Sequence, residues 1–215
     1  MDAVIQFLPR ILDGFLTTLS LLGIAGVSAF VLGVVVAAMR ISPIAPLRAF
    51  ATAYTELVRN TPLTLVLFGC AFVLPYLGLS PGFYPLAAIG LSLYTSPFVA
   101  EAIRSGVNGV PVGQAEAARS IGLGFGQTLG SIVLPQAVRM VVPPLINVFI
   151  ALTKNTSVAG AFFVGELFAA ARFAINQRGD EVIALLIAVA MLYLIVTVPL
   201  GILASAVEKR VAVLR

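Results

Sequence analysis

Long uncharged stretches dominate the chain and give the first prediction of its architecture. Residues 14–39 and 182–207 contain no Asp, Glu, Lys or Arg, and 140–165 contains only Lys154. The stretch 60–100 is also uncharged. It is too long for one helix across a bilayer, which needs about 20 mostly apolar residues, and prolines near its middle divide it. The pattern predicts five membrane-spanning helices, at residues 14–39, 57–77, 84–104, 137–158 and 182–206.

The segment 105–136 has a different pattern, although part of it is uncharged. Four glycines, at positions 122, 124, 126 and 130, lower its helix propensity. It is therefore predicted to be a loop that contains a short interfacial helix. The fold expected is an all-α integral membrane protein, with 1–215 forming a single transmembrane domain.

Positive residues are distributed unevenly between the two sides of this five-span topology. Nine Lys and Arg residues fall on the side of the C-terminus and of segment 105–136, and three fall on the other side. Cytoplasmic loops carry the excess of Lys and Arg in membrane proteins. We therefore expect a multi-pass protein with its N-terminus outside and its C-terminus in the cytoplasm.

Composition excludes several classes of function. Apolar residues make up 60% of the chain and charged residues 10%, against about 25% charged in soluble domains. With no His and a single Cys, the chain offers no His/Cys metal cluster, no disulfide framework and no Ser–His or Cys–His hydrolase site. A net charge of +4 is too small for a nucleic-acid surface. The sequence predicts no catalytic residue, no metal site and no nucleic-acid partner, in a chain embedded in lipid.

The strongest local pattern lies in the 105–136 segment. Pro111 can start a helix, and the Ala-rich run that follows is a good helix former. Glu116 and Arg119 are three residues apart, so they can pair with each other or with a partner protein. Gly122 permits the positive φ that ends such a helix. From these residues alone, a helix lying on lipid and a helix seated in a groove of another protein are both open.

A family resemblance favours the second alternative. The spacing Glu-Ala-Ala, three residues, Gly, nine residues, Ile-x-Leu-Pro resembles the EAA motif of membrane subunits of bacterial ABC importers. It is filled at Glu116, Ala117, Ala118, Gly122, Ile132, Leu134 and Pro135, with Arg119 beside it. Further segments resemble the polar amino-acid branch of that family, the glutamate/glutamine type in particular: 59–63, 94–96, 101–106, 113–114, 134–137 and 154–157.

The resemblance implies a mechanism and a set of partners. It implies a type I ABC importer permease fold in the bacterial plasma membrane, with the EAA segment as a cytoplasmic coupling helix that inserts into an ABC ATPase dimer. A second permease copy or paralogue would complete the path, and an extracytoplasmic binding protein would deliver a polar amino acid, glutamate or glutamine. ATP and Mg²⁺ would be bound by the ATPase and no cofactor by this chain, because neither Lys154 nor Lys209 follows a glycine-rich phosphate loop.

A charged residue inside the fourth predicted span marks a candidate substrate path. Lys154 would cost about 2.5–3.5 kcal/mol at the bilayer centre, so it should face the bundle interior or a wet cavity. It and the next three residues, Asn155, Thr156 and Ser157, offer donors to an amino-acid carboxylate. The alternative is an ion pair with Glu101 or Glu166. The resemblance adds that Asn155 replaces an acidic residue often found in the family.

Three further polar residues are included as tentative path residues. Glu101 and Arg104 are three apart at the end of the third predicted span, where an interfacial salt bridge is the alternative. Thr61 can cap a helix that Pro62 starts.

Two other classes of protein remain as competitors. An ion-coupled secondary amino-acid carrier could use the few intramembrane carboxylates as relays, although no internal repeat is visible. A membrane scaffold could recruit a partner through residues 111–122, but it would have no use for Lys154 inside a span.

Overall fold

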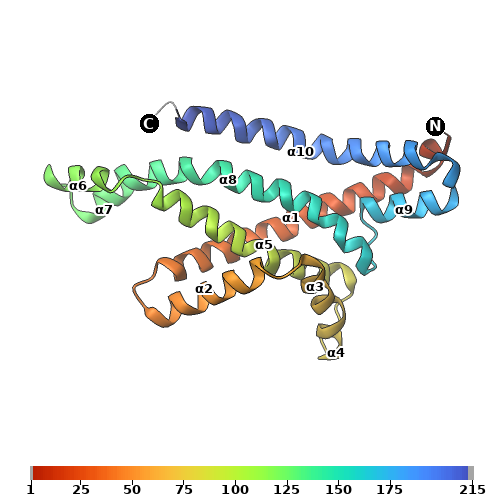
Figure 1. Cartoon of the computed structure of the whole chain (residues 1–215), viewed down its shortest axis with the longest axis horizontal. Coiled ribbons are helices and arrows are strands. Elements are labelled where there is room, and N and C mark those ends of the chain that lie inside the picture. Colours follow the sequence, from red (N-terminus) through yellow and green to blue (C-terminus); the bar gives the residue numbers. More distant parts are fainter. Residues whose placement is uncertain (1, 213–215) are drawn as a thin grey trace.

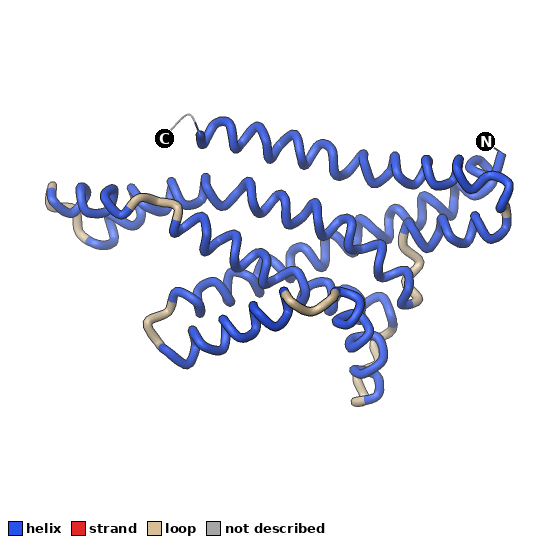
Figure 2. The backbone as a smooth tube through the Cα atoms, viewed as in Figure 1, coloured by secondary structure: helices blue, strands red, loops and turns tan. Residues whose placement is uncertain are grey.

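The computed structural model describes residues 2–212, and every regular element among them is a helix (Figure 2). The first half contains α1 (Asp2–Ile41), α2 (Ala45–Arg59), α3 (Leu63–Phe68), the π-helical turn η1 (Gly69–Val73), α4 (Leu74–Tyr76) and α5 (Phe83–Asn108). The second half contains α6 (Val112–Ser120), α7 (Phe125–Thr128), the π-helical turn η2 (Leu129–Val133), α8 (Leu134–Asn155), the 3-10 helix η3 (Thr156–Phe162), α9 (Leu167–Gln177), the 3-10 turn η4 (Gly179–Glu181) and α10 (Val182–Ala212).

Four helical stretches in the described residues are long and apolar enough to cross a bilayer: Asp2–Ile41, Phe83–Asn108, Phe125–Phe162 and Gly179–Arg210. A fifth is provided by Ala45–Arg59 together with Leu63–Tyr76, which meet at an angle of 104°. The all-helical architecture that the sequence predicts is therefore present. The helix bounds differ from the predicted spans in three places.

The first difference is the bend inside the predicted span 57–77. Helix α2 ends at Arg59, and a new helix begins after Pro62, because proline has no N–H to continue the ladder and restricts the residue before it. The expectation that Thr61 caps the new helix is wrong. Its hydroxyl donates instead to the Leu57 carbonyl, at 2.7 Å, and so satisfies the end of the preceding helix.

The second difference is the start of α1, which begins at Asp2 rather than near residue 14. The early turns are helical because they pack inside the protein: Ala3 and Ile11 are buried in a core that they share with α9 and α10. The Arg10 guanidinium lies over the Phe173 ring of α9, 3.6 Å from its centroid. Charge near the N-terminus therefore does not end the helix.

The third difference concerns segments expected to be irregular. Segment 105–136 is helical over most of its length, through α6, α7 and η2, and it runs directly into α8. The segment after residue 158, for which the pattern predicted no element, contains most of η3 and the whole of α9.

Helices α1 and α5 lie side by side and run in the same direction. Tyr84 donates to the Ser20 hydroxyl near the start of α5, and Arg40 pairs with Glu101 nearer its end. Between these contacts the backbones approach closely, since a Cβ on Gly33 would lie 2.5 Å from Val99 Cβ. The bent pair α2–α4 therefore returns the chain to the end where α5 begins.

The described termini lie at opposite ends of the bundle (Figure 1). The start of α1 lies near α9, at what we call the α9 end, and the end of α10 lies on the same side as α6 and α7, at what we call the α6 end. The main core joins α1, α3, α5, α8 and η3 around Leu21, Leu91 and Leu152.

Candidate functional site

The EAA-like segment forms α6, a short helix that projects from the α6 end (Figure 1). Only Ala118 is buried in it, at 5% exposure, while Glu116, Ala117 and Arg119 are exposed. Within residues 2–212, Glu116 and Arg119 form no ion pair with each other or with another side chain. The helix therefore presents small and charged side chains outward.

Gly122 ends α6 in the way that its position predicts. Its φ is +90°, a conformation that residues with a Cβ rarely adopt. The N–H of Gly122 donates to the Arg119 carbonyl at 3.0 Å and the N–H of Leu123 to the Ala118 carbonyl at 3.2 Å. These two bonds form a Schellman motif, which satisfies the last carbonyls of the helix and reverses the chain.

The second half of the motif lies where the chain enters α8. Ile132 is half-buried in the π-helical turn η2, and Leu134 and Pro135 are exposed at the first turn of α8. Proline cannot donate into the helical ladder, and its ring clashes with the carbonyl four residues earlier. The π-helical turn immediately before Pro135 accommodates this without breaking the helix. The Ile132 carbonyl is used by the Gln136 amide, which donates to it at 2.8 Å.

Helices α6 and α7 are connected to the bundle by a close crossing of α5 and α8. A Cβ on Gly106 would lie 2.2 Å from Val141 Cγ2, and one on Gly109 would lie 2.9 Å from Met140 Sδ. The two helices that flank α6 and α7 are therefore in contact at their near ends.

A cleft of about 420 Å³ lies further along the same two helices. Its wall is formed by residues of α5 and α8: Tyr94, Thr95, Phe98, Asn147, Val148, Ala151, Leu152 and Asn155. The Thr95 hydroxyl is buried and has no hydrogen-bond partner among the described residues. An orphaned buried hydroxyl is costly, and this one belongs to a residue of the cleft wall.

The structure brings only one of the seven predicted path residues, Asn155, to the wall of this cleft. Lys154 is exposed in the last turn of α8, next to the cleft residue. Thr156 and Ser157 donate back to the carbonyls of Thr153 and Lys154, both at 2.7 Å. Their hydroxyls therefore serve the end of α8, while Thr61 lies at the bend between α2 and α3.

Glu101 and Arg104 form the predicted salt bridge, at 2.5 Å. The same carboxylate also pairs with Arg40 of α1, and Arg59 of α2 lies 3.9 Å from it. Three guanidinium groups from three helices therefore surround one carboxylate.

The other carboxylate considered for Lys154, Glu166, is fully buried at the start of α9. It accepts hydrogen bonds from the N–H groups of Phe168 and Ala169 and from the Tyr193 hydroxyl, at 2.7–3.1 Å. Burial raises the pKa of this carboxyl, and the hydrogen bonds offset only part of that shift. Lys154 pairs with neither carboxylate, so the ion pair considered as the alternative to a path role is not formed.

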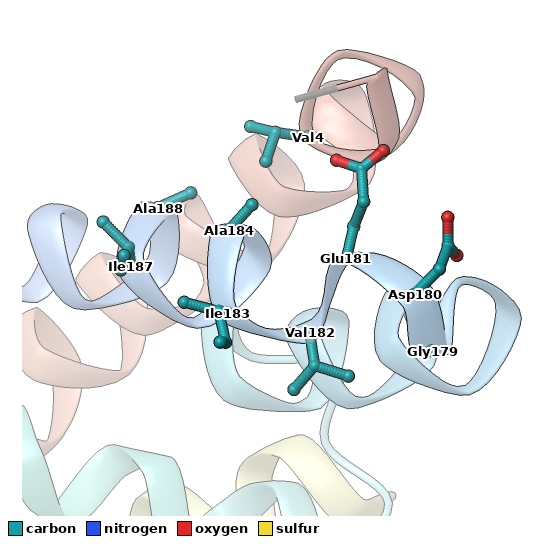
Figure 3. A pocket seen from close by; sticks show the side chains of 9 residues that line it. All are labelled: Val4, Gly179, Asp180, Glu181, Val182, Ile183, Ala184, Ile187 and Ala188. Carbon is teal, nitrogen blue, oxygen red and sulfur yellow. The ribbon is translucent and has the colours of Figure 1, made fainter.

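A larger open groove, of about 730 Å³, lies at the α9 end between the start of α1 and the start of α10 (Figure 3). Its floor is apolar, with Ile183 and Ile187 strongly exposed, and Asp180 lies at its rim. Asp180 already pairs with Arg178, at 2.8 Å. Nowhere in residues 2–212 do three His, Cys, Asp or Glu side chains group as metal ligands. The groove therefore offers mainly an apolar surface, whereas the wall of the cleft includes the side-chain amides of Asn147 and Asn155.

Comparison with known proteins identifies the class of protein that this fold and this segment define. Residues 29–213 match the family described as the binding-protein-dependent transport system inner membrane component. The chain belongs to this family. It is thus a multi-pass inner-membrane permease subunit of an ABC importer, with ATP hydrolysis assigned to a separate subunit rather than to this chain.

Relatives of known name cover nearly the whole chain. It is 42% identical to the glutamate transport system permease protein GluC of Corynebacterium glutamicum, over 95% of both chains. It is 43% identical to the probable glutamine ABC transporter permease protein GlnM of Bacillus subtilis, over 93% of this chain and 92% of that one. The predicted resemblance to the glutamate/glutamine-type permeases is confirmed.

A solved structure supports the type I fold. A chain of an amino acid ABC transporter crystallised with histidines superposes with a TM-score of 0.88 at 28% identity, over 96% of both chains. A chain of a methionine ABC transporter superposes with a TM-score of 0.72 at 22% identity, which shows the same fold.

The sequence analysis missed most of the cleft. Thr95 and Asn147 are polar residues within long apolar runs, and Asn147 stands two turns before Asn155, on one face of α8. That spacing is the one signal in the sequence that could have identified this wall.

Proposed function

We propose that this chain carries glutamate or glutamine inward across the plasma membrane, paired with a second permease subunit around a shared path. The identity to permeases named for glutamate and glutamine supports the substrate class. A second copy or a paralogue would cover the open side of the cleft, where Asn147 is exposed.

The observation that carries the proposal is the form of α6. In α6, Glu116 and Ala117 are exposed, one alanine packs against the rest of the chain, and a glycine with positive φ ends the helix. A helix this short is only marginally stable on its own, so packing against a partner would stabilise it. The small side chains allow close approach to a groove in an ATPase subunit. That partner would bind ATP and Mg²⁺, and its closure would move α6 and, through the α5–α8 crossing, the walls of the cleft.

The cleft and its surroundings would form the substrate path. The unpartnered Thr95 hydroxyl and the amides of Asn147 and Asn155 offer hydrogen bonds to a zwitterionic amino acid. Lys154, beside Asn155, is free of any ion pair among the described residues and would attract a carboxylate. Thr156, Ser157 and Thr61 would shape the helix ends around the path rather than touch the substrate.

The proposed orientation in the membrane is supported by the distribution of the positive residues. The end of α10 and α6 lie together, and this α6 end carries Lys209, Arg210 and Arg119. By the positive-inside rule it would face the cytoplasm, with the N-terminus outside. An extracytoplasmic binding protein would then dock at the α9 end.

The test is ATP hydrolysis by the reconstituted complex of permease, ATPase and binding protein, with and without amino acid. Glu116→Lys and Gly122→Leu should leave the chain inserted but reduce substrate-stimulated ATP hydrolysis about tenfold or more. Glu208→Lys is the matched control, because Glu208 is exposed near the same end, on α10. Stimulation that is unchanged in both α6 variants would contradict the coupling role.

The same preparation separates the importer from an ion-coupled carrier. Uptake into proteoliposomes should require ATP together with the ATPase subunit. Uptake driven by an ion gradient alone, with the ATPase removed, would instead support the carrier.

A further inference from the structure

Three guanidinium groups surround the Glu101 carboxylate, which carries a single negative charge. Its Oε1 accepts from Arg104 and its Oε2 accepts from Arg40, both at 2.5 Å. A carboxylate has two oxygens, and each is already bound to a guanidinium nitrogen at short distance. The third guanidinium, that of Arg59, is left 3.9 Å from Oε2, beyond hydrogen-bond distance.

Arg59 lies between this cluster and the cleft. Its guanidinium carbon is 5.6 Å from the centroid of the Phe98 ring, and Phe98 is part of the cleft wall. Tyr94, Phe98 and Glu101 follow one another at helical spacing on α5, so they lie on one face. The cleft, the Phe98 ring and the Arg59 guanidinium therefore follow one another in space along that face of α5.

The Arg59 side chain is 38% exposed and donates no hydrogen bond to another residue of the described chain. A guanidinium within an apolar bundle is stabilised when it finds an anion, and its planar fork matches a carboxylate. Among the described residues the nearest carboxylate already has two partners. A carboxylate from outside the chain could therefore bind the Arg59 guanidinium.

We propose that Arg59 is a specificity-determining residue, whose guanidinium binds a carboxylate of the amino acid as it leaves the cleft toward the α6 end. This rests on the proposed function in one respect, that the cleft is part of the substrate path. Lys154 and Asn155 stand toward the α9 end of the cleft and Arg59 toward the α6 end, so a dicarboxylic amino acid can be held at both ends. A cationic amino acid is repelled at both.

The test compares amino acid transported per ATP hydrolysed in proteoliposomes containing the whole complex and its loaded binding protein. Arg59→Gln should keep ATP hydrolysis within about twofold of wild type while transport per ATP falls about tenfold or more, the range for losing one charge-assisted hydrogen bond. Arg59→Lys, which retains the charge but loses the planar fork, should show a smaller defect than Arg59→Gln, a fall of about threefold. Equal defects in the Lys and Gln variants would indicate a structural role and overturn the proposal.

Two controls separate this proposal from the one it rests on. Arg48→Gln removes an exposed arginine of the same helix, which donates only to the Ser42 carbonyl, and should change nothing. Asn147→Leu fills the cleft and should block transport. If Asn147→Leu blocks transport but Arg59→Gln does not change it, the role of Arg59 is wrong. If neither variant changes transport, the cleft is not part of the path.

A second variant keeps the test decisive if Arg59→Gln does not assemble. Phe98→Leu removes the ring beneath the guanidinium and leaves the three arginines in place. Transport per ATP should fall about threefold, because the guanidinium is no longer held at the cleft. An unchanged ratio would overturn the proposal.

Discussion

The two ends of the bundle use a carboxylate in opposite ways. At the α9 end, Glu166 is fully buried and holds the first N–H groups of α9 and the Tyr193 hydroxyl of α10. At the α6 end, Glu116 is exposed and has no ion pair among the described residues. The carboxylate at the α9 end is fully used within the chain, and the carboxylate at the α6 end is left for a group outside it.

The difference shows which end carries the stability of the subunit. A buried carboxylate is tolerated only when its oxygens are used, so removing it leaves several donors without a partner. An exposed carboxylate can be removed at little cost. We therefore expect mutations at the α9 end to act on folding, and mutations at the α6 end to act on coupling.

The largest effect is expected for Glu166→Ala. The variant orphans two backbone N–H groups and one hydroxyl, and should lose about 2–4 kcal/mol of stability. Thermal unfolding of the purified protein in detergent should show a midpoint lower by about 5–15 °C. The matched variant at the other end, Glu116→Ala, should shift the midpoint by little. Equal shifts in the two variants would remove the contrast between the ends.

Gly160→Ala should be the next most damaging. A Cβ there would lie 2.3 Å from Glu166 Oε1, so the carboxylate must move away from its donors. The cost should be about 1–3 kcal/mol, as for other overpacked sites. Gly165→Ala is the control, since a Cβ on Gly165 has no atom within 4 Å. The same unfolding assay should place the control near wild type, and a control as unstable as Gly160→Ala would contradict the steric explanation.

The pH dependence of stability should report Glu166 directly. Burial raises the folded-state pKa of this carboxyl above its ordinary value of 4.5. The stabilising contribution of the Glu166 carboxyl to the free energy of unfolding is therefore fully present below pH 4.5. It is lost as pH rises through the folded-state pKa. Relative to Glu166→Gln, which does not titrate, the wild-type unfolding midpoint should fall as pH rises from below 4.5. A midpoint difference that stays constant with pH would contradict this.

The smallest effect on stability is expected for Gly122→Ala, which should act mainly on coupling. The φ of +90° strains any residue with a Cβ, at a cost of about 1–2 kcal/mol, but the strain is confined to the exposed end of α6. The unfolding midpoint should fall by about 2–8 °C at most, whereas substrate-stimulated ATP hydrolysis should fall several-fold. Gly126→Ala on α7 is the control, because Gly126 has neither a positive φ nor a neighbour within 4 Å. A loss of coupling in both variants would show that the turn is not the cause.

Local chemistry made part of this structure predictable from the sequence. The positive φ of Gly122 and the pairing of Glu101 with Arg104 each depend on residues a few positions apart. Gaps between charges likewise placed most of α5, α8 and α10. Such features follow from helical spacing and backbone sterics alone.

Long-range packing made the rest unpredictable. Arg40 and Arg59 reach Glu101 from other helices, across tens of residues of sequence. The importance of Thr95 lies in a hydroxyl that packing leaves without a partner, which no pattern of residue types reveals. The early start of α1 depends in the same way on a core that it shares with α9 and α10.

The close contact of Gly106 with Val141 provides a point about which α5 and α8 can tilt relative to each other. The contact lies beside the segment that leads to α6, and the cleft residues of α5 lie on average about ten residues, or about 15 Å, further along the helix. Helices that touch so tightly at one point can tilt there more easily than they can slide. A tilt of about 10° over that arm displaces the cleft wall by about 2.6 Å, close to the length of a hydrogen bond. Under the proposed function, a small movement of α6 would therefore be enough to make or break hydrogen bonds between Thr95 or Asn155 and a substrate in the cleft.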